Sequence, residues 1–179
     1  NNAWSRVQII QSPVGTPGSN YQGFGDHLAV NYSGSYMAIA ATNHNLGTGY
    51  VAFYTRNSNG ITFNSQNWAI TGFNGQNNYW GRFLRFHPTA INGDLTIGSM
   101  NNVYTNTGPI YICNKNGYTN VGITRPDGDN PSSLFGKDVD FSSDGSVLVI
   151  SERDAPNGNQ GAVHVYHEKV VNQNKIDHQ

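Results

Sequence analysis

Short runs of alternating apolar and polar residues, separated by glycine-containing turns, recur along this chain. After the aromatic–glycine pair Phe24-Gly25, apolar side chains fall on alternate positions, a turn follows at Ser33-Gly34, and a second apolar run covers Met37–Ala41. A polar loop and a third run, introduced by Gly49, complete the pattern. Alternation at period two predicts a half-buried β-strand, and a glycine in the connection allows the positive φ of a tight turn. The segment is therefore predicted to be an antiparallel meander.

The same succession of features occurs three times along the sequence. Aromatic–glycine pairs start at Phe24, Trp80 and Phe135, a period of roughly 55 residues that indicates a repeat architecture. Because side chains alternate along a strand, each third run is predicted to place an apolar pair on one face and Tyr54, Cys113 or Tyr166 on the other. The turns are Ser33-Gly34, Asn92-Gly93 and Asp144-Gly145, the third runs follow Gly49, Gly108 and Gly161, and the apolar pairs are Val51/Phe53, Ile110/Ile112 and Val163/Val165.

Further strands are predicted between the repeats, and the predicted fold class is all-β. Trp68–Thr71 and Tyr118–Thr124 fill the spacers, and Ala3–Gln11 supplies an extra blade strand that would complete a sheet begun elsewhere. Residues 1–179 are thus predicted to form a single repeat-built domain. Its units are three four-stranded antiparallel, blade-like sheets at about 24–79, 80–134 and 135–170. A β-trefoil or a β-prism is the alternative.

Composition supports a turn-rich β protein and argues against two classes of partner. Only 12% of the residues are charged, 21 are glycine, and the formal net charge is −1. Lys and Arg are scattered rather than gathered in a basic stripe, and no apolar run is long enough for membrane insertion, so neither nucleic acid nor a membrane is expected as a partner. The low charge and the many asparagines are interpreted as those of an extracellular or virion-surface protein. The single cysteine, Cys113, occupies an aromatic position of the repeat and is predicted to be structural.

The repeat resembles the FG-GAP repeat of integrin-α-type β-propellers. That unit runs from Phe-Gly through an alternating strand, an Asp-Gly turn and an apolar strand to a Gly-Ala-Val-x-Val-Tyr strand. The third copy matches most fully, with Phe135-Gly136, Asp144-Gly145 and Gly161–Tyr166, whereas the second copy has Trp80 in place of phenylalanine. The resemblance implies blade-like sheets in a β-propeller-like fold and, as in many relatives, adhesion or ligand binding. Closed propellers have about four to eight blades, so a propeller-like fold of three units is incomplete or is completed by a second chain.

The resemblance also implies a calcium loop in the first hairpin of a repeat, of the form Asp-x-Asp-x-Asp-Gly with a later Asp. Calcium requires several oxygen ligands, carboxylates among them. Asp140, Ser142 and Asp144 give part of this spacing, but Leu148 stands where the closing carboxylate would be. An ordinary Asp-Gly turn is the competing interpretation. No cofactor other than this calcium is expected.

Candidate ligand-binding residues lie in the loops that join the strands. Loops on a rigid sheet scaffold commonly carry binding residues, and we expect Asn, Asp and Tyr to suit the hydroxyl groups and apolar faces of sugars. The same residue types also make soluble turns, which is the competing interpretation. The candidates are Asn43, His44, Asn45, Asn77, Asn78, Tyr79, Asn101, Asn102, Tyr104, Asp154 and Asn157.

These features favour a non-catalytic binding or adhesion module that recognises a glycan or a protein ligand through its inter-strand loops. A structural, self-assembling protein (a dimer, shell or filament) is the alternative, because the open sheet edges of an incomplete propeller would join neighbouring chains. A glycoside hydrolase is third, since Glu152 and Asp154 could act as paired carboxylates on a predicted edge loop. The sequence contains no Gly-x-Ser-x-Gly, P-loop or dinucleotide-binding motif.

Overall fold

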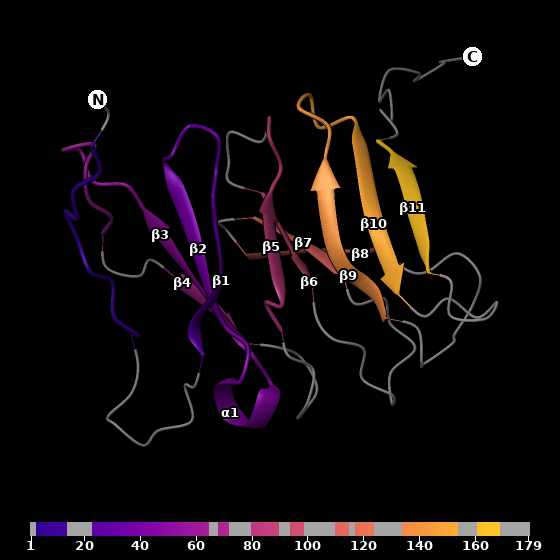
Figure 1. Ribbon diagram of the computed structural model, residues 1–179, viewed down its shortest axis with the longest axis horizontal. Helices are drawn as coiled ribbons and strands as arrows, with labels where there is room; N and C mark the ends of the chain where they lie inside the picture. Colours follow the sequence, from indigo (N-terminus) through magenta and orange to yellow (C-terminus); the bar gives the residue numbers. More distant parts are fainter. Residues whose placement is uncertain are drawn as a thin grey trace, which may run out of the picture.

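The computed structural model describes residues 3–13, 23–64, 68–71, 80–89, 94–98, 110–114, 117–123, 134–153 and 161–168. Within these residues the chain forms three antiparallel sheets and one short helical turn. The sheets lie side by side, in sequence order, along the longest dimension of the molecule (Figure 1). The prediction of an all-β fold is confirmed, whereas the sheets formed by the described residues do not close into a propeller.

Each sheet is built from strands that are consecutive in the sequence. The first sheet contains β1 (Phe24–Val30), β2 (Tyr36–Ala41), β3 (Tyr50–Thr55) and β4 (Trp68–Thr71) in this order. The second contains β5 (Phe83–Phe86), β6 (Leu95–Gly98), β7 (Ile110–Asn114) and β8 (Gly117–Ile123). The third contains β9 (Leu134–Phe141), β10 (Val147–Arg153) and β11 (Ala162–His167), with β10 at its centre. Two of the three predicted sheets thus have four strands, and the described part of the third has three.

The first hairpin of each sheet closes in the same way. The backbone N–H of a residue just after the first strand donates to a carbonyl oxygen at or just before the start of the second. Gly34 and Gly145 have φ values of 68° and 76°, which is the positive φ that the Ser-Gly and Asp-Gly turns predicted. The third predicted turn, Asn92-Gly93, lies outside the described residues. The closing bonds run from Asn31 to Tyr36 (3.0 Å), from His87 to Asp94 (2.9 Å) and from Ser142 to Val147 (2.9 Å).

Because side chains alternate along a strand, each sheet has two faces, which we name by the direction of the chain. The forward face of a sheet is the one turned toward the next sheet in the sequence, and the backward face is the opposite one. In the first sheet, Val51 and Phe53 lie on the forward face and Tyr54 on the backward face. This is the division that the alternation in the third run predicted.

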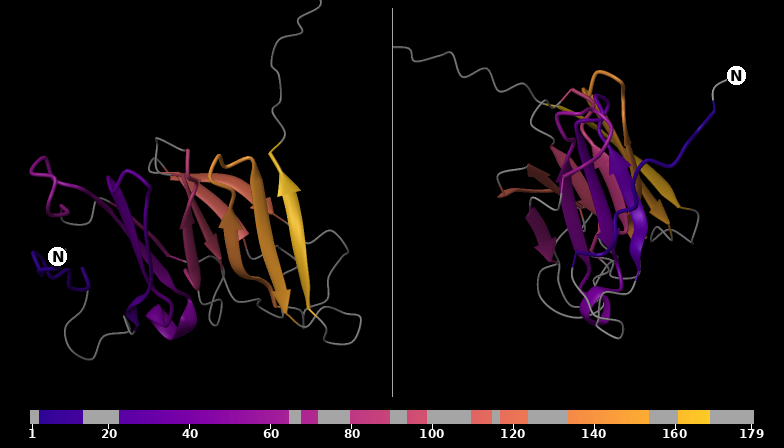
Figure 2. Two further views of the ribbon diagram at one scale, coloured as in Figure 1. Left: turned by 45° about the horizontal axis from the view of Figure 1, so that its top comes forward. Right: turned by 90° about the vertical axis from the view of Figure 1, so that its left-hand side faces the viewer.

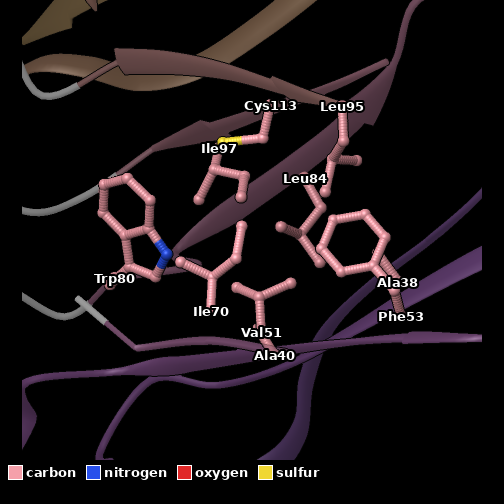
Figure 3. Close-up of a cluster of buried hydrophobic side chains, with 10 residues drawn as sticks. All are labelled: Ala38, Ala40, Val51, Phe53, Ile70, Trp80, Leu84, Leu95, Ile97 and Cys113. Atoms are coloured by element: carbon pink, nitrogen blue, oxygen red, sulfur yellow. The ribbon is translucent and has the colours of Figure 1, made fainter. Parts of the chain in front are cut away.

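The first and second sheets share an apolar core, formed by the forward face of one and the backward face of the other (Figure 3). Full burial of one large apolar side chain stabilises a fold by about 1.5–3 kcal/mol, so this core is a principal source of stability. The first sheet contributes Ala38, Ala40, Val51, Phe53 and Ile70, and the second contributes Trp80, Leu84, Leu95, Ile97 and Cys113.

Two further apolar clusters continue this arrangement. The second and third sheets join through a core of Phe83, Ile110, Phe135, Val139, Leu148 and Ile150. On the backward face of the first sheet, Ile39, Ala41, Tyr50, Ala52 and Tyr54 form a third cluster. Side chains of the surrounding segments, Ile10 and Phe63 among them, pack against this third cluster.

Cys113 is fully buried in the core between the first and second sheets. Burial raises the pKa of its thiol to about 12, so the nucleophilic thiolate is not populated near neutral pH. The thiol therefore packs as a small apolar group, in agreement with the predicted structural role.

Residues 3–13 do not form the predicted strand Ala3–Gln11. Ile10 packs against the backward-face cluster, and the Gln8 side chain takes the place of a backbone ladder. Gln8 Nε2 donates to the Phe63 carbonyl oxygen at 3.0 Å, and Gln8 Oε1 accepts from the Phe63 N–H at 2.8 Å. The strand prediction is wrong because alternation describes the segment itself, whereas strand pairing requires the backbone of a neighbour.

Gly49 holds the end of the loop before β3 against the second sheet. Its φ is +83°, and it forms an isolated parallel bridge with Trp80. A Cβ at this position would lie 2.4 Å from both the backbone nitrogen and the backbone oxygen of Trp80. Glycine is therefore required for two reasons, the backbone conformation and the close approach of another backbone.

We expect Gly49→Ala to lower the free energy of unfolding by about 2–4 kcal/mol, because the new Cβ meets both an unfavourable φ and the Trp80 backbone. Gly60→Ala is the matched control, since Gly60 also has a positive φ, +67°, but nothing lies within 4 Å of its Cβ position. Strain alone predicts a loss of about 1 kcal/mol there. Urea denaturation followed by tryptophan fluorescence measures both variants. Equal losses would contradict the importance of the Gly49–Trp80 contact.

Candidate functional site

The loop Thr42–Gly49, between β2 and β3, is the candidate binding loop that the structure describes most fully. Its middle is α1 (His44–Gly47), a single turn. Asn43 and Asn45 are exposed, and Leu46 beside them is exposed as well. The loop therefore presents amide groups and one apolar side chain to solvent.

Buried contacts fix the base of this loop to the first sheet. Thr42, where the loop begins, donates a hydrogen bond from its hydroxyl to the carboxylate of Asp26 on β1. His44 is buried, and its ring lies against that of Tyr50 with the ring centroids 5.4 Å apart. Together with the Gly49–Trp80 contact, these interactions hold both ends of the loop on the sheets.

The backbone of α1 is left-handed at its centre. Asn45 has a φ of 46° and Leu46 a φ of 58°. Such a conformation costs a non-glycine residue roughly 1–3 kcal/mol, and a leucine there is a marked departure from the usual preference. The Thr48 side chain steadies the turn, since its hydroxyl donates to the Asn45 carbonyl oxygen at 2.9 Å. A strained, exposed turn on a fixed base motivates a functional hypothesis for this loop.

The loop lies on one rim of the stacked sheets, that is, on a side where strands begin and end, and two of the hairpin turns lie on the opposite rim. In Figures 1 and 2, α1 is at the end where β10 stops and β11 begins. The β1–β2 and β9–β10 turns are at the other end (Figure 1). The strand ends that flank residues 154–160 thus open toward the same end as the loop Thr42–Gly49.

The structure describes three of the predicted ligand-binding residues and brings them together in this loop. Asn43 and Asn45 are exposed as expected, whereas the side chain of His44 is buried beneath them. The other predicted contacts lie outside the described residues and stay predictions. They are Asn77, Asn78, Tyr79, Asn101, Asn102, Tyr104, Asp154 and Asn157.

The predicted calcium residues take part in a turn and in an ion pair. The Asp144 carboxylate accepts hydrogen bonds from the Ser142 hydroxyl at 2.5 Å and from the N–H and hydroxyl of Ser146 at 3.1 Å and 2.9 Å. Asp140 lies 4.0 Å from Arg85 Nε of the second sheet. Among the residues that the structure describes, no group of three or more His, Cys, Asp or Glu side chains is placed to hold a metal ion.

Glu152 lies inside the stack of sheets and not on the predicted edge loop. It belongs to β10 and is buried, with its carboxylate 2.8 Å from His164 Nε2. The His164 ring packs edge-on against Phe135, with the ring centroids 5.1 Å apart. The edge-loop prediction is wrong because β10 continues to Arg153 and turns Glu152 toward the interior. Asp154, its proposed partner in a glycosidase, falls beyond the described end of β10.

A row of charged side chains crosses the first strands of the three sheets, and the sequence analysis missed it. Arg85 of β5 lies 3.8 Å from Asp138 of β9. His27 of β1 has a lowered pKa because of partial burial and of Arg82 and Arg85, an effect that Asp26 and Asp138 oppose. The charges are far apart in the sequence, and only an alignment of the three first strands would have placed them together. Exposed ion pairs of this kind contribute about 0–1 kcal/mol, so the row adds little to stability.

Comparison of the chain with protein-family models, with curated proteins and with solved structures finds no match. The helical turn of the described residues is too short to cross a membrane.

The hydrogen bonds to Asp144 give a test in acid. They lower the pKa of its carboxyl group from 3.8 to about 2, the Ser142 hydroxyl having the largest effect. Because the folded-state pKa is the lower one, the group stabilises the fold above about pH 3.8, and this contribution is lost as the pH falls toward 2. We expect Ser142→Ala to return the pKa toward 3.8, as measured by NMR titration of the carboxyl carbon. Ser58→Ala, in another exposed turn, should leave it unchanged. An equal pKa in Ser142→Ala and the unaltered chain would contradict the assignment.

Proposed function

We propose that the chain is a non-catalytic binding or adhesion module of the extracellular space or a virion surface. In this proposal the sheets are blades of an open β-propeller-like array, as the resemblance to FG-GAP repeats implies. The ligand is a glycan, and it binds on the rim of the stacked sheets where the loop Thr42–Gly49 lies.

The observation that carries this proposal is the left-handed turn at Asn45 and Leu46. A plain connection between β2 and β3 would be more stable with glycine at these positions, because glycine adopts positive φ without steric cost. The amide of Asn45 and the apolar side chain of Leu46 are instead held in solvent. The retained strain is explained if both side chains contact a ligand.

The chemistry of the loop suits a sugar. The Asn43 and Asn45 amides each provide a donor and an acceptor, which match the hydroxyl groups of a pyranose ring. Leu46 beside them offers a small apolar surface for the C–H groups of the ring. The fixed base formed by Thr42, His44 and Gly49 limits the entropy lost on binding.

A glycan array probed with the folded chain, in calcium and in chelator, tests the proposal. We expect specific binding that Asn43→Ala weakens by about fivefold, the equivalent of one hydrogen bond of about 1 kcal/mol. Asn45→Asp should weaken it similarly, because it removes the donor while keeping a residue type that tolerates left-handed φ.

Asn64→Asp is the matched control. Asn64 is also exposed, but its N–H bonds to the carbonyl of Thr55, at the end of β3 away from this loop. Its glycan binding should equal that of the unaltered chain. Loss of binding in chelator would assign the ligand to a calcium-dependent site instead. No binding in either condition would contradict the glycan proposal and leave a protein ligand to be tested.

A further inference from the structure

We propose that the chain assembles head to tail with a second copy of itself, the forward face of the third sheet packing on the backward face of the first sheet of its partner. This contact would repeat, between molecules, the contact that joins consecutive sheets within the chain. This contact is independent of the proposed glycan site, which lies on a rim of the stacked sheets and not on a sheet face.

The forward face of the third sheet exposes side chains that are buried at the equivalent positions of the other repeats. Val51, Ile110 and Val163 each lie two residues after the glycine that opens the third run. The first two are 0% exposed and Val163 is 68% exposed. Val165 on the same face is 60% exposed. The repeat therefore presents an apolar side chain at this position three times, and among the described residues it is covered twice.

On the backward face of the first sheet, the β1 part, beside the cluster against which Ile10 and Phe63 pack, has the complementary property. Leu28, Leu84 and Val139 each lie four residues after the aromatic that opens the repeat, and their exposed fractions are 62%, 1% and 2%. In the second and third sheets this position is buried against the preceding sheet. Val30, on the same face as Leu28, is 50% exposed. An apolar position is thus uncovered on the one sheet that has no sheet before it among the described residues.

These two faces lie at opposite ends of the molecule, so one chain cannot bring them together. The first sheet is at one end of the long dimension and β11 at the other (Figures 1 and 2). Inside the molecule, the forward face of the first sheet is covered by the backward face of the second, and the forward face of the second by the backward face of the third. A second copy supplies a backward face on which the equivalent position of the repeat is open, at Leu28 with Val30 beside it, which is why we infer a copy of the chain as the partner.

A head-to-tail contact has defined consequences for the assembly. It joins two different surfaces, so it produces a closed ring if the rotation between copies closes and a filament if it does not. Two copies would provide six sheets, a number within the range of about four to eight found in closed propellers. The sequence predicted self-association through sheet edges, whereas the exposed side chains described here point to sheet faces.

Sedimentation analysis of the full chain over a range of concentrations tests the proposal. We expect a mass of at least twice that of the monomer. Val163→Asp with Val165→Asp should raise the dissociation constant more than about 100-fold, because burial of two carboxylates replaces burial of two apolar side chains. Leu28→Asp with Val30→Asp should do the same from the other face. A chain that stays monomeric at all concentrations would overturn the proposal.

Mixing the two double variants distinguishes a head-to-tail contact from a symmetric one. Each variant alone should be monomeric, since each lacks one of the two surfaces. In an equimolar mixture, one intact forward face meets one intact backward face, so a heterodimer forms that cannot grow further. Assembly that only one of the two variants abolishes, or a mixture that stays monomeric, would contradict the head-to-tail geometry.

Two controls keep the test tied to these faces. Leu46→Asp changes a leucine that is also 62% exposed but belongs to the loop Thr42–Gly49, so we expect the assembly to be unaffected. Leu46→Asp also alters the proposed glycan site. Loss of glycan binding with unchanged assembly in this variant would therefore show that the two properties can fail separately. Val163→Thr with Val165→Thr keeps the β-branched shape, and it should weaken assembly even if the aspartate variant does not fold.

Discussion

Burial of apolar side chains between consecutive sheets is the constraint on which the rest of this molecule depends. Apolar side chains lie on both faces of the first and second sheets, so each of these sheets requires a neighbour on either side. Within the chain the requirement is met by stacking consecutive sheets and, on the backward face of the first sheet, by segments that include Ile10 and Phe63. Exposed apolar side chains remain on the first and the last sheet, Leu28 on the first and Val163 on the last.

Stacking also anchors the loop between β2 and β3. Gly49 contacts the backbone of Trp80, a residue of the core between the first and second sheets. The loop before β3 is therefore anchored to two sheets at once. An unusual backbone conformation at Asn45 and Leu46 can persist only on such a base, because the surrounding contacts outweigh its cost. The anchoring and the backbone strain of this loop therefore both depend on the close approach of the first and second sheets.

Local patterns predicted the parts of the fold that are locally determined. Alternation and turn glycines located β4 and β8, the closing hairpins, and the division of Val51 and Tyr54 between two faces. They failed where the outcome depends on a distant neighbour. The segment 3–11 has the alternation of a strand, but the Gln8 side chain takes the place of backbone pairing, and Glu152 is buried because β10 extends further than its polar sequence suggested. The left-handed turn had an incomplete local signal, since Asn45 is of a residue type that tolerates positive φ but Leu46 is not.

The strand order has a consequence for how the chain acquires its structure. Every ladder within a sheet joins strands that are neighbours in the sequence, so each sheet depends on contacts of short sequence separation. During synthesis the first sheet can form once Thr71 has left the ribosome, before the second sheet exists. Until Trp80 and Leu95 arrive, the nascent chain carries Val51 and Phe53 on an open apolar surface. In the interval between these two events the nascent chain therefore exposes an apolar surface through which it can misassociate.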